Sequence, residues 1–230
     1  MWPLVLLTPI LASLGSAPQP SVSLDELASR VQAYYDSLPG FEARFTQRYE
    51  RRIVKKVIVE TGTLAVKKPG RMRWEYQSPE EKLFLTDGEK SYFYLPEERQ
   101  VIVSHAASGA MGMTHGSPFE LLAGRGRLRD AFEVLPSDSE PRMGGAMLRL
   151  LPRRAQEQYE EVELEVDPDS GEVRRVVLLD TLGNQTEFLF EQVRENHRLP
   201  DSLFRFTVPS GVDIVLASET WDPSPREPIR

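Results

Sequence analysis

The most constraining feature of the sequence is residues 61–104, where apolar and polar side chains alternate with a period of two. Met72, Trp74 and Tyr76 fall on one side of this alternation, and charged residues fall between them. Such alternation is typical of antiparallel strands that bury one face. Proline–glycine and aspartate–glycine pairs separate the apolar runs and supply the backbone angles that tight turns need. The stretch therefore predicts four or five consecutive antiparallel strands.

The alternation places large aromatic side chains on one face of this sheet. Trp74 and Tyr76 lie on that face, and we expect Tyr92 and Tyr94 to join them from a later strand. Exposing a whole sheet face of such side chains to water is unfavourable. Another part of the chain must therefore cover it.

Two segments have the pattern of helices that could provide this cover. In residues 24–38, apolar side chains recur at spacings of three and four, with Ser23 and Glu26 at the positions of a capping box. In residues 118–123, a proline at the first position and a following glycine indicate a short helix. The helices could cover a ligand cavity, or they could fill the interior permanently as ordinary core.

Further strands are expected on both sides of this stretch. Apolar segments recur at intervals of ten to fifteen residues, as in a barrel or a sandwich. The expected strands cover residues 41–46, 51–60 with a basic turn or bulge, 132–135, 147–151, 162–166, 173–179, 187–193 and 203–208. The sequence thus predicts a mainly β fold with two helices.

The ends of the chain suggest export and a single domain. Residues 1–17 combine an apolar run with small residues at its end, which predicts a cleaved secretory signal peptide, although no basic residue precedes the run. A short membrane anchor is the alternative, but 17 residues with two prolines are marginal for a span of about 20. We expect one domain over 18–221 and a flexible tail over 222–230. With no cysteine, the chain has neither disulfides nor a thiol for lipid attachment.

Motifs for chemistry are missing from the sequence, and we therefore expect no enzyme activity, cofactor or metal. There is no G-x-S-x-G nucleophile motif and no phosphate-binding glycine loop, and His105, His115 and His197 are too scattered for a zinc site. The net charge of −7, with both signs mixed, argues against nucleic acid, and no polybasic helix points to an anionic membrane. These observations favour a protein that binds an apolar ligand.

Several motifs, in order, resemble those of the LolA family of periplasmic lipoprotein carriers. The resemblance extends from about Ser23 to Val215, and the order and spacing of so many elements make it specific. The matching segments are FEARFTQ at 41–47, GTL at 62–64, VKKPGRMRWEY at 66–76, TDG at 86–88, YFY at 92–94, SPFELL at 117–122, and an expected closing strand over 204–212.

The resemblance implies a fold, a function and a set of partners. The expected fold is an unclosed antiparallel half-barrel with an α-helical lid over an apolar cavity. The expected function is to bind the acyl chains of lipoproteins released by an inner-membrane ABC transporter complex and to deliver them to an outer-membrane receptor. Such a carrier is periplasmic and works as a monomer.

The resemblance also assigns candidate site residues. The residues expected to line the lipid-binding cavity are Tyr35, Phe41, Phe45, Leu64, Met72, Trp74 and Leu122. Lys68 stands where the family commonly has an arginine that holds the lid. A lysine lacks the planar fork of an arginine, so lid closure could be looser here or could depend on Arg71 or Arg73.

Three other functions are compatible with parts of the sequence. An outer-membrane receptor of the same fold would itself be a lipoprotein, which the missing cysteine disfavours. A periplasmic lipid or lipoprotein sensor of the same fold is the main alternative, although such sensors tend to carry a further C-terminal domain. An esterase is disfavoured because no nucleophile constellation is present.

Overall fold

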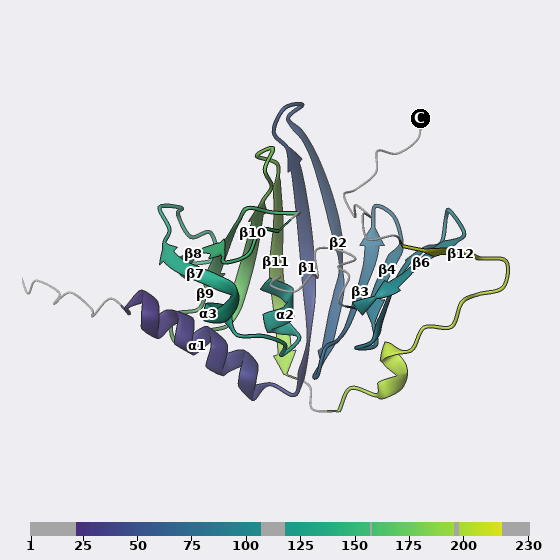
Figure 1. The fold of residues 1–230 in the computed structure, drawn as a ribbon, viewed down its shortest axis with the longest axis horizontal. Coiled ribbons are helices and arrows are strands. Elements are labelled where there is room, and N and C mark those ends of the chain that lie inside the picture. The colour runs from purple at the N-terminus through teal and green to yellow at the C-terminus, as the bar shows by residue number, and fades with distance from the viewer. Residues whose placement is uncertain (1–21, 107–117, 157, 196–197, 218–230) are drawn as a thin grey trace, which may run out of the picture.

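The structure is a computed structural model that describes residues 22–106, 118–156, 158–195 and 198–217. Its main feature is a single 12-stranded sheet that curves around three short helices (Figure 1). The predicted signal peptide over 1–17 and the predicted tail over 222–230 lie outside the described residues. Within the described part of the chain, no helix is long and apolar enough to cross a membrane.

The elements follow the chain in the order that the alternation predicts. The helices are α1 (Leu24–Ser37), α2 (Pro118–Leu122), α3 (Leu128–Ala131) and the 3-10 helix η3 (Asp201–Phe204). The strands are β1 (Gly40–Arg51), β2 (Lys56–Lys67), β3 (Arg71–Ser78), β4 (Lys82–Thr86), β5 (Lys90–Leu95), β6 (Gln100–His105), β7 (Phe132–Pro136), β8 (Ala146–Pro152), β9 (Glu161–Val166), β10 (Val173–Leu179), β11 (Gln185–Glu195) and β12 (Asp213–Leu216).

The sheet is not closed into a barrel. Its strand order is β12-β6-β5-β4-β3-β2-β1-β11-β10-β9-β8-β7, so β12 and β7 form the two edges of the described sheet and do not pair with each other. Every neighbouring pair is antiparallel except β12 with β6. The helices α1, α2 and α3 lie against the concave side (Figure 1). The expected unclosed half-barrel with a helical cover is confirmed.

The pairing register decides which side chains face the concave side. Trp74 on β3 lies opposite Leu64 on β2 and Phe84 on β4, and all three are buried. The expectation for Tyr92 and Tyr94 is wrong. Phe84 pairs with Phe93, so Phe93 takes the inward position and its two neighbours point to the convex face. There both tyrosine rings contact Phe206, with centroid distances of 5.3 and 5.5 Å.

The first helix forms where the capping signal predicts it. The Ser23 hydroxyl accepts a hydrogen bond from the Glu26 backbone N–H at 3.2 Å, which satisfies one of the unpaired donors at the helix start. Leu27, Val31 and Tyr35 form its buried stripe against the sheet. The helix ends before Pro39-Gly40, as expected, because a residue that precedes proline disfavours the helical conformation.

The predicted strand over 203–208 and the expected closing strand over 204–212 are both wrong. Residues 201–204 form the 3-10 helix η3, and the last strand is β12, which pairs in parallel with β6. Phe204 is buried against Ala65 and Leu199 on the convex face, so its apolar character reflects local packing and not sheet formation. Asp201 anchors η3 through Lys67 Nζ at 2.5 Å and Arg71 Nη1 at 2.7 Å.

A buried charge network lies on the convex face of β9, β10 and β11. Arg175 Nε donates to Glu187 Oε1 at 2.5 Å, and Arg175 Nη1 lies 3.7 Å from Glu165 Oε2. Glu165 is fully buried. Its carboxylate accepts hydrogen bonds from the backbone N–H groups of Arg142, Met143 and Gly145 in the β7–β8 loop. The network therefore fastens this loop to the sheet.

We expect Arg175→Met to lower the free energy of unfolding by about 3 kcal/mol or more, because it removes the buried cation that Glu165 and Glu187 share and leaves Glu187 paired with the more exposed Arg142. Urea denaturation measures this change. Arg174→Met is the control. Its partly exposed pair with Asp167 is worth about 1 kcal/mol or less. Equal losses in the two variants would contradict a buried network.

Candidate functional site

The concave face carries a cluster of aromatic rings centred on Trp74. The Trp74 ring lies 5.0 Å from Phe45, 5.4 Å from Phe119 and 5.6 Å from Phe188, measured between centroids and in edge-to-face arrangements. Phe45 and Phe188 come from β1 and β11, whereas Phe119 enters from α2. Edge-to-face pairs are favourable beyond their buried area. The short helix α2 is thus held to the sheet largely by apolar and aromatic packing.

The structure brings all seven predicted cavity residues into one apolar cluster. Each is at most 3% exposed, and all seven belong to the main hydrophobic core between the sheet and the helices. These residues are Tyr35, Phe41, Phe45, Leu64, Met72, Trp74 and Leu122. In this conformation their side chains pack against one another, so an apolar ligand could enter only if part of the cover moved.

The predicted cavity set omitted several members of the cluster, although the alternation had placed Tyr76 on the same face as Trp74. Phe119, Phe188, Phe190 and Tyr76 contact the same rings. The i, i+2 spacing of Phe188 and Phe190 in an expected strand was a signal that both face inward. Phe119 lay beside the predicted Leu122 in the same helix.

Tyr35 ties α1 to the far half of the sheet. Its hydroxyl accepts a hydrogen bond from the Val173 backbone N–H on β10 at 3.2 Å, and its ring contacts Phe41 on β1. Burial raises the pKa of Tyr35 well above its ordinary value. The side chain therefore stays neutral and acts as a fixed support for α1.

The interior becomes polar toward the β1–β2 turn. Tyr76 Oη donates to Gln47 Oε1 at 2.7 Å, and Lys82 pairs with the buried Glu60 and lies 5.3 Å from the Tyr76 ring centre. Burial raises the pKa of Tyr76 well above its ordinary value. The aromatic cluster thus has an apolar floor and one polar end.

The segment that follows α2 interlocks with the β2–β3 turn, and we call α2 with residues 123–125 the lid. The backbone N–H of Gly70 donates to Ala123 O at 3.0 Å. The stem of Lys68 lies on Gly124, where an added Cβ would come within 2.4 Å of Lys68 Cδ. Gly124 has φ +67°, a conformation that glycine adopts at little cost.

Arg125 makes the reciprocal contact. It lies on Gly70, where an added Cβ would come within 2.0 Å of Arg125 Nε, and its Nη2 donates to Gly88 O at 2.6 Å. Two basic side chains and two glycines therefore clasp the lid to the turns of the sheet. We call Lys68, Gly70, Gly124 and Arg125 the clasp.

The predicted lid-holding residues occupy different surroundings. Among the described residues, Lys68 Nζ is buried and has no hydrogen-bond partner. The guanidinium groups of Arg71 and Arg73 bind the η3 segment instead, through Asp201 at 2.7 Å and Leu203 O at 3.2 Å. Arg125 donates a side-chain hydrogen bond from the lid to the sheet, at Gly88 O, in addition to the backbone bond between Gly70 and Ala123.

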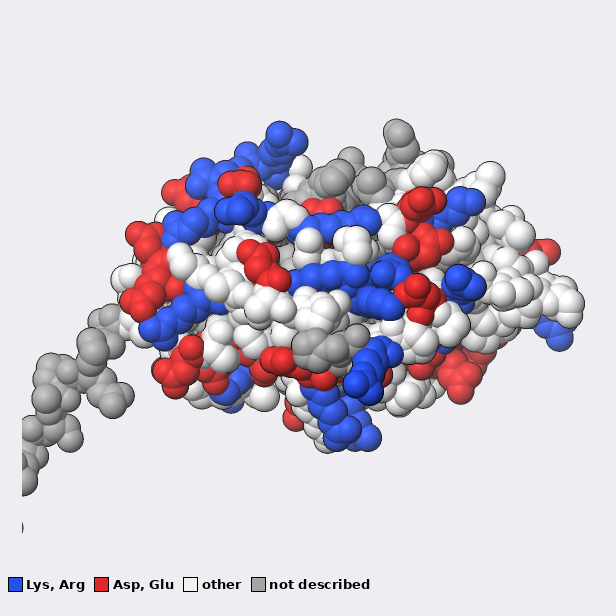
Figure 2. All heavy atoms as spheres, turned by 90° about the horizontal axis from the view of Figure 1, so that it is seen from below, with Lys and Arg blue, Asp and Glu red and all other residues white. Residues whose placement is uncertain are grey.

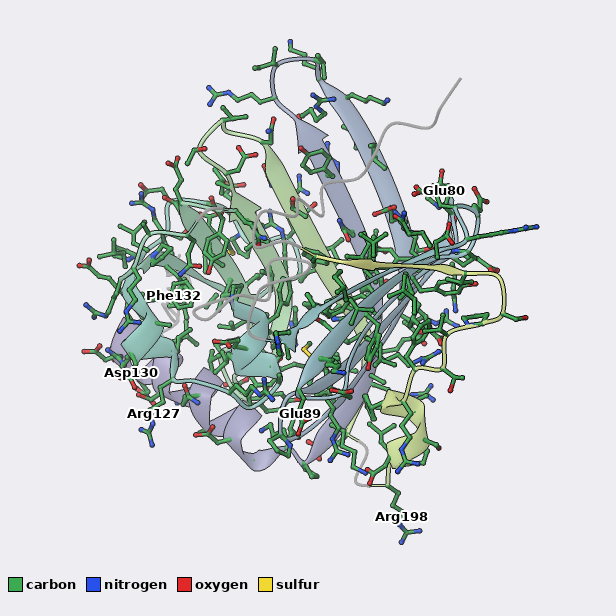
Figure 3. All side chains as sticks on the ribbon, turned by 45° about the vertical axis from the view of Figure 1, so that its right-hand side comes forward. Glu80, Glu89, Arg127, Asp130, Phe132 and Arg198 are labelled. Atoms are coloured by element: carbon green, nitrogen blue, oxygen red, sulfur yellow. The ribbon has the colours of Figure 1, made fainter. Side chains whose placement is uncertain are left out.

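The end of the molecule that carries the clasp has mixed charge. Figure 2 shows this end, where Lys and Arg side chains lie among Asp and Glu and do not form one basic field. In Figure 3, Glu89 and Arg127 mark its two sides, in the β4–β5 turn and between α2 and α3. The two basic residues of the clasp are therefore not part of a larger basic surface on this face of the molecule.

Comparison with known proteins agrees with this geometry. An unclosed antiparallel sheet with a helical lid over an aromatic concave face defines the fold class. Residues 36–207 match the family model described as outer membrane lipoprotein carrier protein LolA. The chain belongs to the LolA family of outer-membrane lipoprotein carrier proteins.

Individual relatives support the assignment. An outer-membrane lipoprotein carrier protein of Dechloromonas aromatica (strain RCB) is 31% identical over 209 residues, 91% of each chain. One of Bordetella avium (strain 197N) is 31% identical over 205 residues, 89% of this chain and 94% of the relative. An uncharacterised conserved protein of Thermus thermophilus shares the fold, with 14% identity, a TM-score of 0.52 and coverage of 84% of this chain and 98% of that one.

We expect Lys68→Met to raise the free energy of unfolding by about 1 kcal/mol at pH 7. The variant keeps the stem on Gly124 and removes a buried charge that has no hydrogen bond within the described structure. Thermal or urea denaturation measures the change. Lys67→Met is the control and should destabilise slightly, because Lys67 Nζ binds Leu199 O at 2.6 Å and Asp201. A destabilised Lys68→Met variant would contradict the account.

The stability difference between the wild type and Lys68→Met should depend on pH. Burial lowers the pKa of Lys68 below its ordinary value of 10.5, so the unfolded chain holds this proton more tightly than the folded chain. The stability of the wild type should therefore rise as the pH increases from neutral toward 10.5, relative to Lys68→Met, which lacks the group. Denaturation of both proteins between pH 7 and about 10 tests the sign. If the stability advantage of Lys68→Met over the wild type grew as the pH increased, the predicted sign would be wrong.

Proposed function

We propose that this protein is a periplasmic carrier that encloses the acyl chains of lipoproteins released from the inner membrane and delivers them to an outer-membrane receptor. The observation that carries the proposal is the aromatic concave face of a sheet that does not close, covered by a lid held through a small clasp. The donor would be an inner-membrane ABC transporter complex. The protein would act by binding and not by chemistry.

The cargo explains why such a face is useful. Each methylene of an acyl chain costs about 0.8 kcal/mol when it is exposed to water, so several long chains cannot cross an aqueous compartment uncovered. A curved sheet lined with Phe45, Trp74 and Phe188 offers apolar surface of the required kind. Because the two edges do not pair, the sheet could widen without losing a strand–strand ladder.

The closed lid explains how a carrier could release its cargo. If the empty protein is mostly closed, opening costs free energy and lowers the apparent affinity for acyl chains. A receptor with an open site could then take the cargo. Lys68 and Arg125 would set this balance, because they join the lid to the turns that follow β2 and β4.

Trp74 offers a specific contact for the cargo. Its indole Nε1–H is buried and has no hydrogen-bond partner among the residues that the structure describes. A buried donor without an acceptor is rare and costly in folded proteins. The ester or amide carbonyl of an acylated cysteine is an acceptor that could satisfy it.

We expect Trp74→Phe to weaken binding of a triacylated lipopeptide about three- to tenfold, the effect of one lost hydrogen bond. The phenyl ring keeps most of the apolar packing. Calorimetric titration measures the affinity. A lipopeptide with ether-linked chains is the matched control ligand, and its affinity should fall less because it lacks the ester carbonyls. Equal losses for the two ligands would mean that Trp74 does not donate to an ester carbonyl.

We expect Arg125→Met to raise the apparent affinity for the lipopeptide about two- to tenfold, because loss of the hydrogen bond to Gly88 O favours the open lid. Transfer to receptor should slow in proportion. Arg127→Met is the control, since Arg127 is exposed two residues further on and should leave both values unchanged. Weaker binding by Arg125→Met would show that Arg125 contacts cargo and does not hold the lid.

The proposal as a whole is tested with membrane vesicles. Purified protein should release lipoproteins from inner-membrane vesicles that contain the transporter into a water-soluble complex, and should then pass them to outer-membrane vesicles. Mass spectrometry of the complex should find intact acyl chains. Hydrolysed chains would point to an enzyme, and binding without transfer would point to a sensor of the same fold.

A further inference from the structure

The β1–β2 hairpin carries two exposed apolar residues at its tip. Ile53 is 83% exposed and Val54 is 57% exposed in the turn between the strands. The hairpin extends beyond the other turns at this end of the sheet (Figure 1). It lies at the opposite end of β1 from Gly40, which pairs with Lys67 next to the clasp. The tip is therefore separate from the lid.

Turn formation does not account for these two residues. Exposed turns favour Gly, Asn, Asp, Pro and Ser, which adopt or stabilise the required backbone angles. Ile53 and Val54 are β-branched and bury little surface in the fold. Lys55, which follows them, even adopts a positive φ of 51° that glycine or asparagine would adopt more readily. The apolar tip thus calls for an explanation outside folding.

Basic residues surround the apolar tip. Arg51 and Arg52 precede it, and Lys55 and Lys56 follow it, with no acidic residue between positions 51 and 59. The whole chain has a net charge of −7, so this concentration of positive charge is local. The arrangement is an apolar point with a cationic collar.

A neighbouring turn supports the tip and adds to it. The backbone N–H of Arg52 donates to Asn184 Oδ1 at 3.1 Å. The Arg52 guanidinium lies over Gly183, where an added Cβ would come within 2.8 Å of Nη1. Leu182 in this β10–β11 turn is 68% exposed. Three exposed apolar side chains from two joined turns therefore gather at one end of the molecule.

We propose that this tip docks on an anionic bilayer surface. Ile53, Val54 and Leu182 would enter the interface below the headgroups, and the collar from Arg51 to Lys56 would bind lipid phosphates. Apolar residues at the point with cations just behind them match the order of acyl and phosphate layers in a membrane. The tip is also small compared with the roughly 800 Å² that each partner buries in a typical protein interface.

The proposal stands independently of the acyl-binding site. The empty protein should bind vesicles through the tip while the lid stays closed at the other end. Such docking would bring a carrier to the membrane surface where it loads or unloads. Failure of acyl binding would leave the docking proposal intact, and failure of docking would leave the carrier proposal intact.

Flotation of the purified protein with vesicles tests the proposal. With phosphatidylethanolamine–phosphatidylglycerol vesicles at low salt, the wild type should float, and the Ile53→Asn/Val54→Asn double variant should bind at least about tenfold more weakly. Lys55→Glu should also weaken binding. Binding should fall with added salt and be much weaker on phosphatidylcholine vesicles.

The controls keep the result clear. Leu216→Asn removes an equally exposed apolar side chain from β12 and should leave vesicle binding unchanged. The double variant should unfold at or above the wild-type temperature, because asparagine suits the turn better. Wild-type protein that fails to float, or a double variant that floats as well as the wild type, overturns the proposal. Binding only to vesicles that contain transporter protein would overturn it as well, since the partner of the tip would then be a protein.

Discussion

The structure depends on one constraint, which is that the large antiparallel sheet stays open. A closed barrel would pair its edge strands and seal its interior, whereas the described β7 and β12 stay apart at opposite edges. The concave face is lined with Trp74, Phe45 and Phe188, and such a surface cannot stay in water. The helices must therefore supply the missing wall. An interior covered in this way can be uncovered again without breaking the sheet.

Among the described residues, the lid is joined to the sheet by aromatic packing and by individual hydrogen bonds. The lid relies on Phe119 packed against Trp74, one backbone hydrogen bond at Gly70, and Arg125 on Gly88 O. Individual hydrogen bonds of this kind contribute about 1 kcal/mol each. The buried ammonium of Lys68 opposes closure slightly, because burial disfavours its charge. The free energy of each contact that holds the lid closed is therefore of a size that burial of an apolar ligand could offset.

Much of this arrangement follows from the sequence by simple physical rules. Period-two alternation predicted β2 to β6, and the Ser23 cap predicted the start of α1. Resemblance to the family supplied the inward residues around Trp74. The positions of Tyr92 and Tyr94 were not recoverable, because a shift of one residue in register reverses a strand's faces. The role of Arg125 in holding the lid was not recoverable either, because its contact with Gly70 joins segments far apart in the chain.

The central claim, that the lid must open to admit acyl chains, can be tested with an engineered disulfide. The sequence contains no cysteine, and an added Cβ at Gly124 would lie 2.8 Å from Lys68 Cγ, close to the spacing of a Cβ and the partner sulfur in a disulfide. In the Lys68→Cys/Gly124→Cys variant, acyl-lipopeptide binding would be measured before and after reduction. We predict that the oxidised protein does not bind and that reduction restores binding, whereas equal binding in both states would contradict the account.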